Sequence, residues 1–255
     1  MNLSMYDVLK WIADKNNLFL LITVLTSFSS LLFSFEWIQN TYHLNFKNNK
    51  SKFKKIQIFQ ILKIFITVFL LIIIFYKHLH FTLNSQFNLL ILILIFTIWI
   101  AELFTFIQFN GIYNGGSDTM YMILWHSLFL SFLFSKKIGM LFLTIMLVFS
   151  YFKAGLSKLK HISWRNGTAI NFFISKPYTT TNFKKYFNYP NFNFILSYLI
   201  IIWEISIIGI TFFPNNIKLI YFFIATIFHL MIFLQFGLNR FFWTWIPAWL
   251  SIFII

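Results

Sequence analysis

The 255-residue chain contains no cysteine and few charged residues. Without thiols it forms no disulfide, uses no thiolate nucleophile and holds no cysteine-ligated zinc. Only 10% of its residues are charged, whereas about a quarter are charged in an average soluble domain. So little charge does not keep a chain of this size dispersed in water, which excludes a soluble globular protein.

Apolar and aromatic residues fill the sequence instead. Hydrophobic residues make up 59% of it, including 38 Phe, 11 Tyr and 9 Trp. The apolar runs are about 20 residues long, which suits helices that cross a bilayer; a spanning strand needs only about half that length. We therefore expect an all-α, polytopic integral membrane bundle of about eight transmembrane helices. The expected ranges are 18–38, 57–76, 88–109, 118–135, 138–157, 193–213, 217–236 and 240–255.

The charges that are present are mostly basic. Twenty Lys and Arg against six Asp and Glu give a net charge of +14. They lie between apolar runs, which favours contact with an anionic lipid bilayer over nucleic acid. The connections 39–56 and 158–192 follow odd-numbered helices and carry most of these charges, so the positive-inside rule places them in the cytoplasm and the N-terminus outside. The predicted location is a bacterial cytoplasmic membrane, crossed several times.

We expect one transmembrane domain over residues 1–255. Residues 1–17 mix polar and apolar side chains in a pattern that predicts a short interfacial helix. The connection 158–192 is long and polar, which indicates a surface or re-entrant segment. No motif of a soluble enzyme occurs, and no cluster of metal ligands is predicted.

Ionisable residues inside apolar runs are the first functional candidates, because charge in a membrane is costly. Glu102, Glu204 and His229 lie nearest to the middle of their predicted helices. Two interpretations are open. In the first, these residues form a proton relay, an ion site or the partners of a catalytic lysine. In the second, each makes an interhelical hydrogen bond that fixes the packing of the helices. Glu36 and Lys63 lie near predicted helix ends, which indicates side chains that reach back to the headgroups.

The stretch YNGGSD precedes the fourth predicted helix. Its glycines permit a tight turn, and Asp118 would lie at the helix start, where a carboxylate caps the helix and complements its dipole.

The most distinctive segment is Tyr151–Ala169, YFKAGLSKLKHISWRNGTA. Tyr151, Ala154, Gly155 and Lys158 are spaced so that they share one helix face. The small pair lets another helix approach closely, which would place the Lys158 amine near a packed interior, where desolvation makes a lysine a useful base. The alternative is a lysine at a helix end that reaches for headgroups.

This segment resembles the HTTM family, the membrane domain shared with vitamin K-dependent γ-glutamyl carboxylase. It also resembles the sporulation-delaying protein B type of peptide-toxin maturation protein. The pattern Y-F-x-A-G-x-x-K-L-x-x-x-x-W-x-x-G-T-A carries the resemblance. Weaker similarity lies at Asn114 before the fourth helix, at Trp203–Glu204 and at Phe228–His229.

The resemblance implies that Lys158 is the base that begins deprotonation of a reduced quinone. Oxygen then reacts, and the strong base that forms removes a proton from a substrate Glu before carbon dioxide adds. Further catalytic roles, in positioning substrate or relaying protons, would fall to Glu204, His229 and Asp118. Substrate contacts would fall to Tyr151, Gly155, Trp164 and Asn114. A small secreted peptide or a partner membrane subunit is the implied partner.

Two departures favour a divergent member over a true carboxylase. Ser157 stands where the carboxylase has the first of two lysines, and NGGSD stands where it has an Asn-His pair. A non-enzymatic transporter or immunity-type protein, with Glu102, Glu204 and His229 as a proton path, is the first alternative. It ranks second because the sequence has neither paired broken helices nor half-to-half symmetry. A membrane partner subunit without chemistry of its own is the other alternative.

Overall fold

The computed structural model describes residues 14–43, 50–80, 85–108, 116–174 and 189–255. Throughout these ranges the chain is helical and contains no strand, so the predicted all-α class is confirmed. Asn114 and nearly all of the predicted interfacial helix in 1–17 lie outside the described residues.

Six of the described helices are long and apolar enough to cross a membrane, which suggests a multi-pass membrane protein. Their ranges match six of the eight predicted spans. They are α2 (Lys15–His43), α3 (Lys50–His80), α4 (Ser85–Gln108), α6 (Lys136–Lys160), α10 (Pro190–Ser206, continued by η1, Ile207–Phe212) and α11 (Asn215–Phe236). The other two predicted spans correspond to α5 (Gly116–Leu133, 18 residues) and α12 (Asn239–Leu250, 12 residues). The count of about eight spans is therefore not confirmed.

Proline and glycine mark the ends of the later helices. Pro190 opens α10, where its fixed φ suits the first helical turn and its missing N–H leaves no bond unmade. Pro214 precedes α11, and Gly237 follows it with a left-handed φ of 67°. The Gly237 N–H donates to the carbonyl of Phe233 at 2.8 Å, which completes the last turn of α11.

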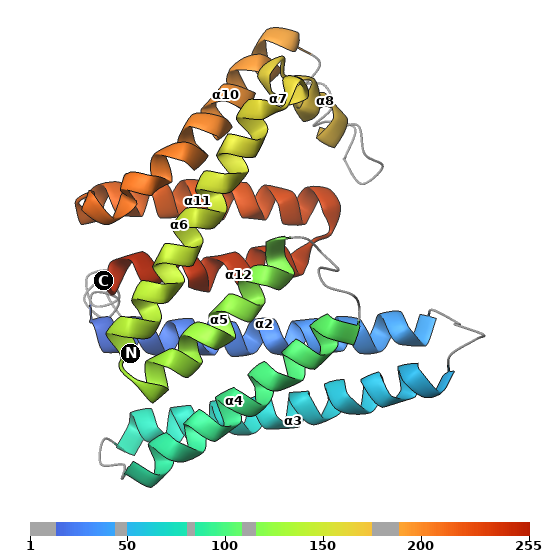
Figure 1. The fold of residues 1–255 in the computed structure, drawn as a ribbon, viewed down its shortest axis with the longest axis vertical. Helices are drawn as coiled ribbons and strands as arrows, with labels where there is room; N and C mark the ends of the chain where they lie inside the picture. Colours follow the sequence, from blue (N-terminus) through green and yellow to red (C-terminus); the bar gives the residue numbers. More distant parts are fainter. Residues whose placement is uncertain (1–13, 44–49, 81–84, 109–115, 175–188) are drawn as a thin grey trace, which may run out of the picture. The chain divides into compact units, whose positions relative to one another are not determined.

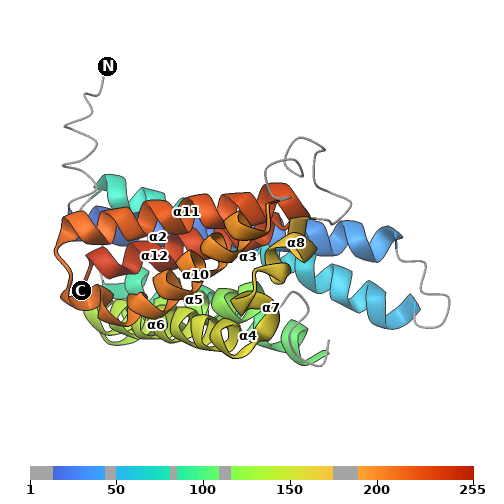
Figure 2. The same ribbon diagram turned by 90° about the horizontal axis from the view of Figure 1, so that it is seen from above.

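The chain packs into two compact units, with a boundary that falls inside α6. Unit 1 comprises Met1–Leu143 and Trp243–Ile255. In it α2 packs against α3 and α5, α3 against α4, and α4 against α5, which closes a ring of four helices (Figures 1 and 2). The last part of α12 and the short η2 (Ser251–Phe253) lie against α2, where the Ser29 hydroxyl donates to the Trp243 carbonyl at 2.7 Å.

The interior of unit 1 is rich in hydroxyl groups. On α2 alone, six buried residues are serine or threonine, namely Thr23, Thr26, Ser27, Ser29, Ser30 and Ser34. Several of these hydroxyls donate to the carbonyl one turn back, as Thr26 does to Ile22 at 2.8 Å. Unit 1 is thus a helix bundle with an apolar exterior and a partly polar interior.

Unit 2 comprises Thr144–Phe242, and it contains the start of the polar connection 158–192. Two short helices, α7 (Ile162–Arg165) and α8 (Thr168–Ile174), pack against each other and against the start of α10 (Figure 1). Gly167 joins them with φ of 77°, and a Cβ there would lie 2.6 Å from the Phe194 nitrogen. Only glycine fits, so the WRNGTA motif is a tight connector seated on α10. The prediction of one domain over the whole chain stays a prediction.

Candidate functional site

Lys158 and Glu204 form an ion pair within unit 2. The Lys158 amine, in the last turn of α6, donates to both carboxylate oxygens of Glu204 on α10 at 2.6 Å. The Glu204 side chain is 3% exposed and that of Lys158 is 17% exposed. The ring of Trp164 on α7 lies 5.1 Å from the amine, within range of a cation–π contact. A buried carboxylate therefore holds an amine that solvent still reaches.

Gly155 brings α6 close enough to α10 for this pair to form. A Cβ at this position would lie 2.8 Å from Ile205 Cγ1 and 3.0 Å from Glu204 Cβ. The first distance is shorter than real Cβ contacts and the second is unusually tight, so the helices touch through the bare backbone of Gly155. The predicted close approach of another helix at this small residue is confirmed.

Tyr151 and His229 form a second polar contact in unit 2. The Tyr151 hydroxyl is hydrogen-bonded to His229 Nε2, and both side chains are buried. The Tyr151 ring also packs edge-on against Trp203, at 5.3 Å between centroids, and Trp203 immediately precedes Glu204. This contact joins α6 to α11 about one turn before Gly155, on the same face of α6.

Most of the predicted site residues thus share one unit. Lys158 contacts Glu204 and Trp164, and Tyr151 contacts His229. Asp118 lies in the first turn of α5, as predicted for a helix start, but it belongs to unit 1. The predicted proton path is also divided between the units, because Glu102 belongs to unit 1 and its other two members to unit 2.

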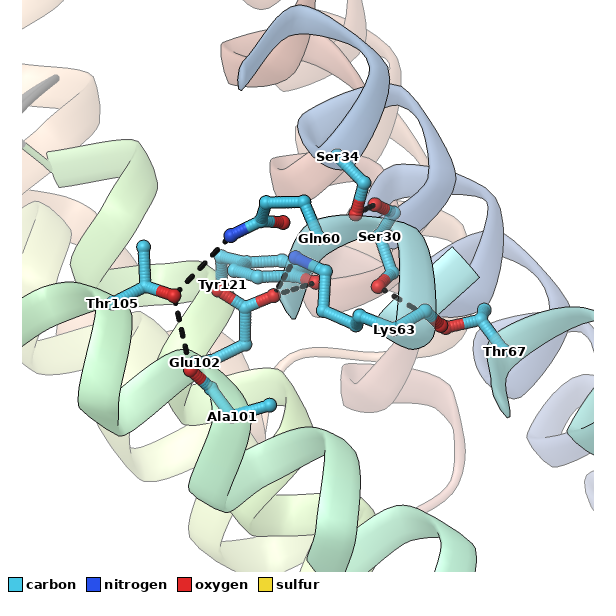
Figure 3. A network of polar contacts seen from close by, with 9 residues as sticks. All are labelled: Ser30, Ser34, Gln60, Lys63, Thr67, Ala101, Glu102, Thr105 and Tyr121. Carbon is cyan, nitrogen blue, oxygen red and sulfur yellow. Dashed lines mark hydrogen bonds and ion pairs between the residues drawn. The ribbon is translucent and has the colours of Figure 1, made fainter. Parts of the chain in front are cut away.

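Unit 1 contains its own buried ion pair, between Lys63 on α3 and Glu102 on α4 (Figure 3). Lys63 Nζ and the Tyr121 hydroxyl both donate to Glu102 Oε1, the latter at 3.0 Å. The side chains of Lys63 and Glu102 are 1% and 2% exposed. The interpretation of Lys63 as a side chain reaching for headgroups is wrong, because α3 begins at Lys50 and Lys63 lies about three and a half turns inside it.

Aromatic rings enclose the Lys63 amine. It lies 4.8 Å from the centroid of Phe33 on α2 and 5.9 Å from that of Tyr121 on α5. The two rings stack on each other, with an interplanar angle of 12°. All four helices of the ring therefore contribute a side chain to this cluster.

Gln60 extends the cluster along α3 toward α4 (Figure 3). Its Nε2 donates to Thr105 Oγ1 at 3.3 Å, and Thr105 donates in turn to the Ala101 carbonyl at 3.0 Å. Its Oε1 is buried and has no hydrogen-bond partner within the described residues.

The sequence marked Glu102 and Lys63 as separate ionisable candidates but did not predict that they pair. A usable signal was present, because Gln60, Lys63 and Thr67 recur at i, i+3 and i+7 and so form a polar stripe on a very apolar helix. Over the parts of the chain that the structure describes, no three His, Asp or Glu side chains gather to hold a metal. Comparisons of the chain with protein-family models, with curated proteins and with solved structures give no match.

Proposed function

We propose that the protein is a membrane enzyme of HTTM type, divergent from the carboxylase, in which Lys158 is the base that takes a proton from a substrate. The observation that carries the proposal is the pairing of a partly exposed amine with a buried carboxylate. Lys158 is 17% exposed and its partner Glu204 only 3%. A general base must be within reach of its substrate, and Lys158 meets this condition whereas the enclosed Lys63 does not.

The surroundings of Lys158 favour its protonated product. The ion pair corresponds to the protonated form of Lys158: when the neutral amine accepts a proton, the bonding electron pair stays on the substrate and an ammonium forms beside the Glu204 carboxylate. Both oxygens of that carboxylate lie 2.6 Å from Nζ, and the Trp164 ring faces the same amine. Each contact stabilises a cation, so each strengthens Lys158 as a proton acceptor.

The Tyr151–His229 pair has a positioning role in this proposal. It lies on the same face of α6 as Lys158 and holds Trp203 against α6 through ring contacts. Because Trp203 and Glu204 are neighbours on α10, the pair fixes the side of α10 from which Glu204 reaches the amine.

A reduced quinone, the cofactor that the family resemblance implies, supplies when bound a hydroxyl group that a base can deprotonate. The residues fit a molecule of this class in two respects. The amine that would accept the proton is partly open, and the aromatic ring of Trp164 lies 5.1 Å from it, while a second ring, that of Trp203, packs against Tyr151 one residue before Glu204. A small secreted peptide is the proposed final substrate, as in carboxylation or peptide maturation.

We place the protein in a bacterial cytoplasmic membrane, with the Lys158 end of α6 at the cytoplasmic face. The basic connection 158–192 supports this orientation. We propose that the chain has eight membrane segments, of which α5 and α12 are the two shortest.

The test uses Lys158→Arg in protein purified into lipid nanodiscs. Arginine keeps the positive charge beside Glu204 but does not lose its proton in proteins, so it cannot act as a base. We expect consumption of a short-chain reduced quinone, with oxygen accepting its electrons, to fall by about 100-fold or more. Lys160→Arg, in the same helical turn, is the matched control and should leave the rate unchanged. Wild-type rates in folded Lys158→Arg would refute the proposal.

A further inference from the structure

We infer that the Lys63–Glu102 cluster in unit 1 is a proton-binding site, at which Glu102 takes up a proton from water while Lys63 keeps its charge (Figure 3). The inference uses residues of unit 1 alone. It does not depend on the role of Lys158, and the two proposals fail or succeed separately.

Packing alone does not require this ion pair. Bringing two opposite charges out of water costs several kcal/mol per ion, and apolar residues of similar volume often hold two helices together as well or better. Both side chains are almost fully enclosed, within helices apolar enough to cross a membrane. Ionisable groups in that setting are rare and mark ion or proton sites.

The cluster contains other partners for the Lys63 ammonium in the state in which Glu102 is protonated and neutral. When Glu102 becomes neutral, the Lys63 ammonium loses its counter-charge and needs other partners. The rings of Phe33 and Tyr121 lie 4.8 and 5.9 Å from it, and both attract a cation. A third partner is Gln60 Oε1, a buried acceptor that has no hydrogen-bond partner among the described residues. Because Gln60 lies three residues before Lys63, the two side chains share a helix face.

The remaining contacts keep these partners in place during proton uptake. Thr105 holds the amide of Gln60 through its Nε2, which leaves Oε1 as the free end of the side chain. Tyr121 donates to Glu102 Oε1 and can do so whether the carboxyl group is charged or neutral. The ion pair that ties α3 to α4 is thereby exchanged for contacts of the Lys63 ammonium with rings on α2 and α5 and with Gln60 on α3.

Charged groups on the other helices of the ring affect the same equilibrium. On α5, Asp118 lies buried three residues before Tyr121, and His126 is partly exposed five residues after it. On α2, Glu36 follows Phe33 by three residues, and α4 has no charged residue besides Glu102. A negative charge on Asp118 or Glu36 would favour a site with one additional proton.

Infrared difference spectroscopy tests the inference on the full chain in vesicles of zwitterionic lipid. Between neutral and acidic buffer, we expect a carbonyl band of a protonated carboxylic acid that Glu102→Gln removes. Glu36→Gln and Asp118→Asn are the matched controls and should retain it. With a pH-indicator dye, Glu102→Gln should take up one proton fewer per chain than the wild type.

A second variant keeps the test decisive if Glu102→Gln folds poorly. In Lys63→Met the carboxyl group of Glu102 is buried without a counter-charge, so it should already be protonated at neutral pH and show the band there. The inference is overturned if Glu102→Gln, with intact helical circular dichroism, gives the wild-type band and proton count. It is equally overturned if Lys63→Met lacks the band at neutral pH.

Discussion

At the scale of single residues, the two lysine–glutamate pairs differ chiefly in how far water reaches them. The Lys158 side chain is 17% exposed and that of Lys63 is 1% exposed. An exposed amine can exchange its proton with solvent or a substrate at once, whereas an enclosed one does so only when its surroundings rearrange. The Lys158–Glu204 pair is therefore suited to general base catalysis in unit 2, whereas the Lys63–Glu102 pair is suited to slow proton binding in unit 1.

Removing the carboxylate beside Lys158 should make its amine more reactive toward acylating reagents. Both Glu204 oxygens hold the amine at 2.6 Å, so in Glu204→Gln the amine loses its charged partner and is freer to reach a reagent. We expect mass spectrometry to show faster acylation of Lys158 in the variant at one fixed pH. The exposed Lys160 serves as the internal control. Equal or slower labelling would mean that the ion pair does not restrain the amine.

Breaking the Lys63–Glu102 pair on one side should destabilise the protein far more than removing both charges. Lys63→Ala leaves Glu102 buried without its counter-charge and a cavity where the lysine side chain was, so the folded protein must neutralise the carboxyl group by taking up a proton; we expect the free energy of unfolding to fall by about 3–5 kcal/mol. The double variant Lys63→Met with Glu102→Leu should lie close to the wild type. Thermal unfolding in detergent micelles measures both, with exposed Lys153→Ala as a neutral control. A double variant as unstable as the single one would contradict this account.

At the scale of helices, apolar run length predicted the positions of the membrane segments well. The predicted ranges 57–76 and 217–236 begin within two residues of the spans Gln57–His78 and Asn215–Phe236. What run length could not reveal is the polar first part of α3, from Lys50, which moves Lys63 from a helix end to its interior. Hydropathy also does not show which helices pack against each other, so the pairing of Lys63 with Glu102 on α4 was missed.

The segment around Lys158 was more predictable because its spacing has a geometric meaning. Tyr151, Gly155 and Lys158 share a helix face, and that face meets Glu204 and His229 in the structure. The two short helices α7 and α8 were not predicted. They depend on the left-handed Gly167 and on a seat against α10, and both are tertiary features.

The α5–α6 hairpin depends on one glycine at its close approach. A Cβ at Gly139 would lie 1.9 Å from Ser131 Oγ and 2.3 Å from the Ser127 carbonyl oxygen. We expect Gly139→Ala to force the helices apart and destabilise the protein by about 2–3 kcal/mol, measured as a lower midpoint of thermal unfolding. Gly116→Ala is the matched control, because among the described residues its Cβ would meet only Trp245, at an ordinary 3.7 Å. Equal midpoints for the two variants would show that the hairpin is not closely packed.

At the scale of the whole molecule, the path of α5 decides how many times the chain crosses the membrane. α5 has 18 residues and is about 27 Å long, close to the thickness of a bilayer core. In unit 1, the Lys136 amine just after α5 donates to Asn16 Oδ1 at 2.7 Å, at the start of α2. The turn after α5 therefore lies at the same end of unit 1 as the start of α2, which requires α5 to run the length of the unit.

Single cysteines report this path directly, since the chain has none of its own. We expect Asp14→Cys and Lys137→Cys to react with a membrane-impermeant maleimide from the same side, and Gln39→Cys, at the far end of α2, only from the other. If the basic connections face the cytoplasm, intact cells label the first two and not the third. Labelling of Asp14→Cys and Lys137→Cys from opposite sides would mean that α5 does not cross. Labelling of Gln39→Cys alone would keep the α5 crossing but reverse the orientation, and would put Lys158 on the outer face.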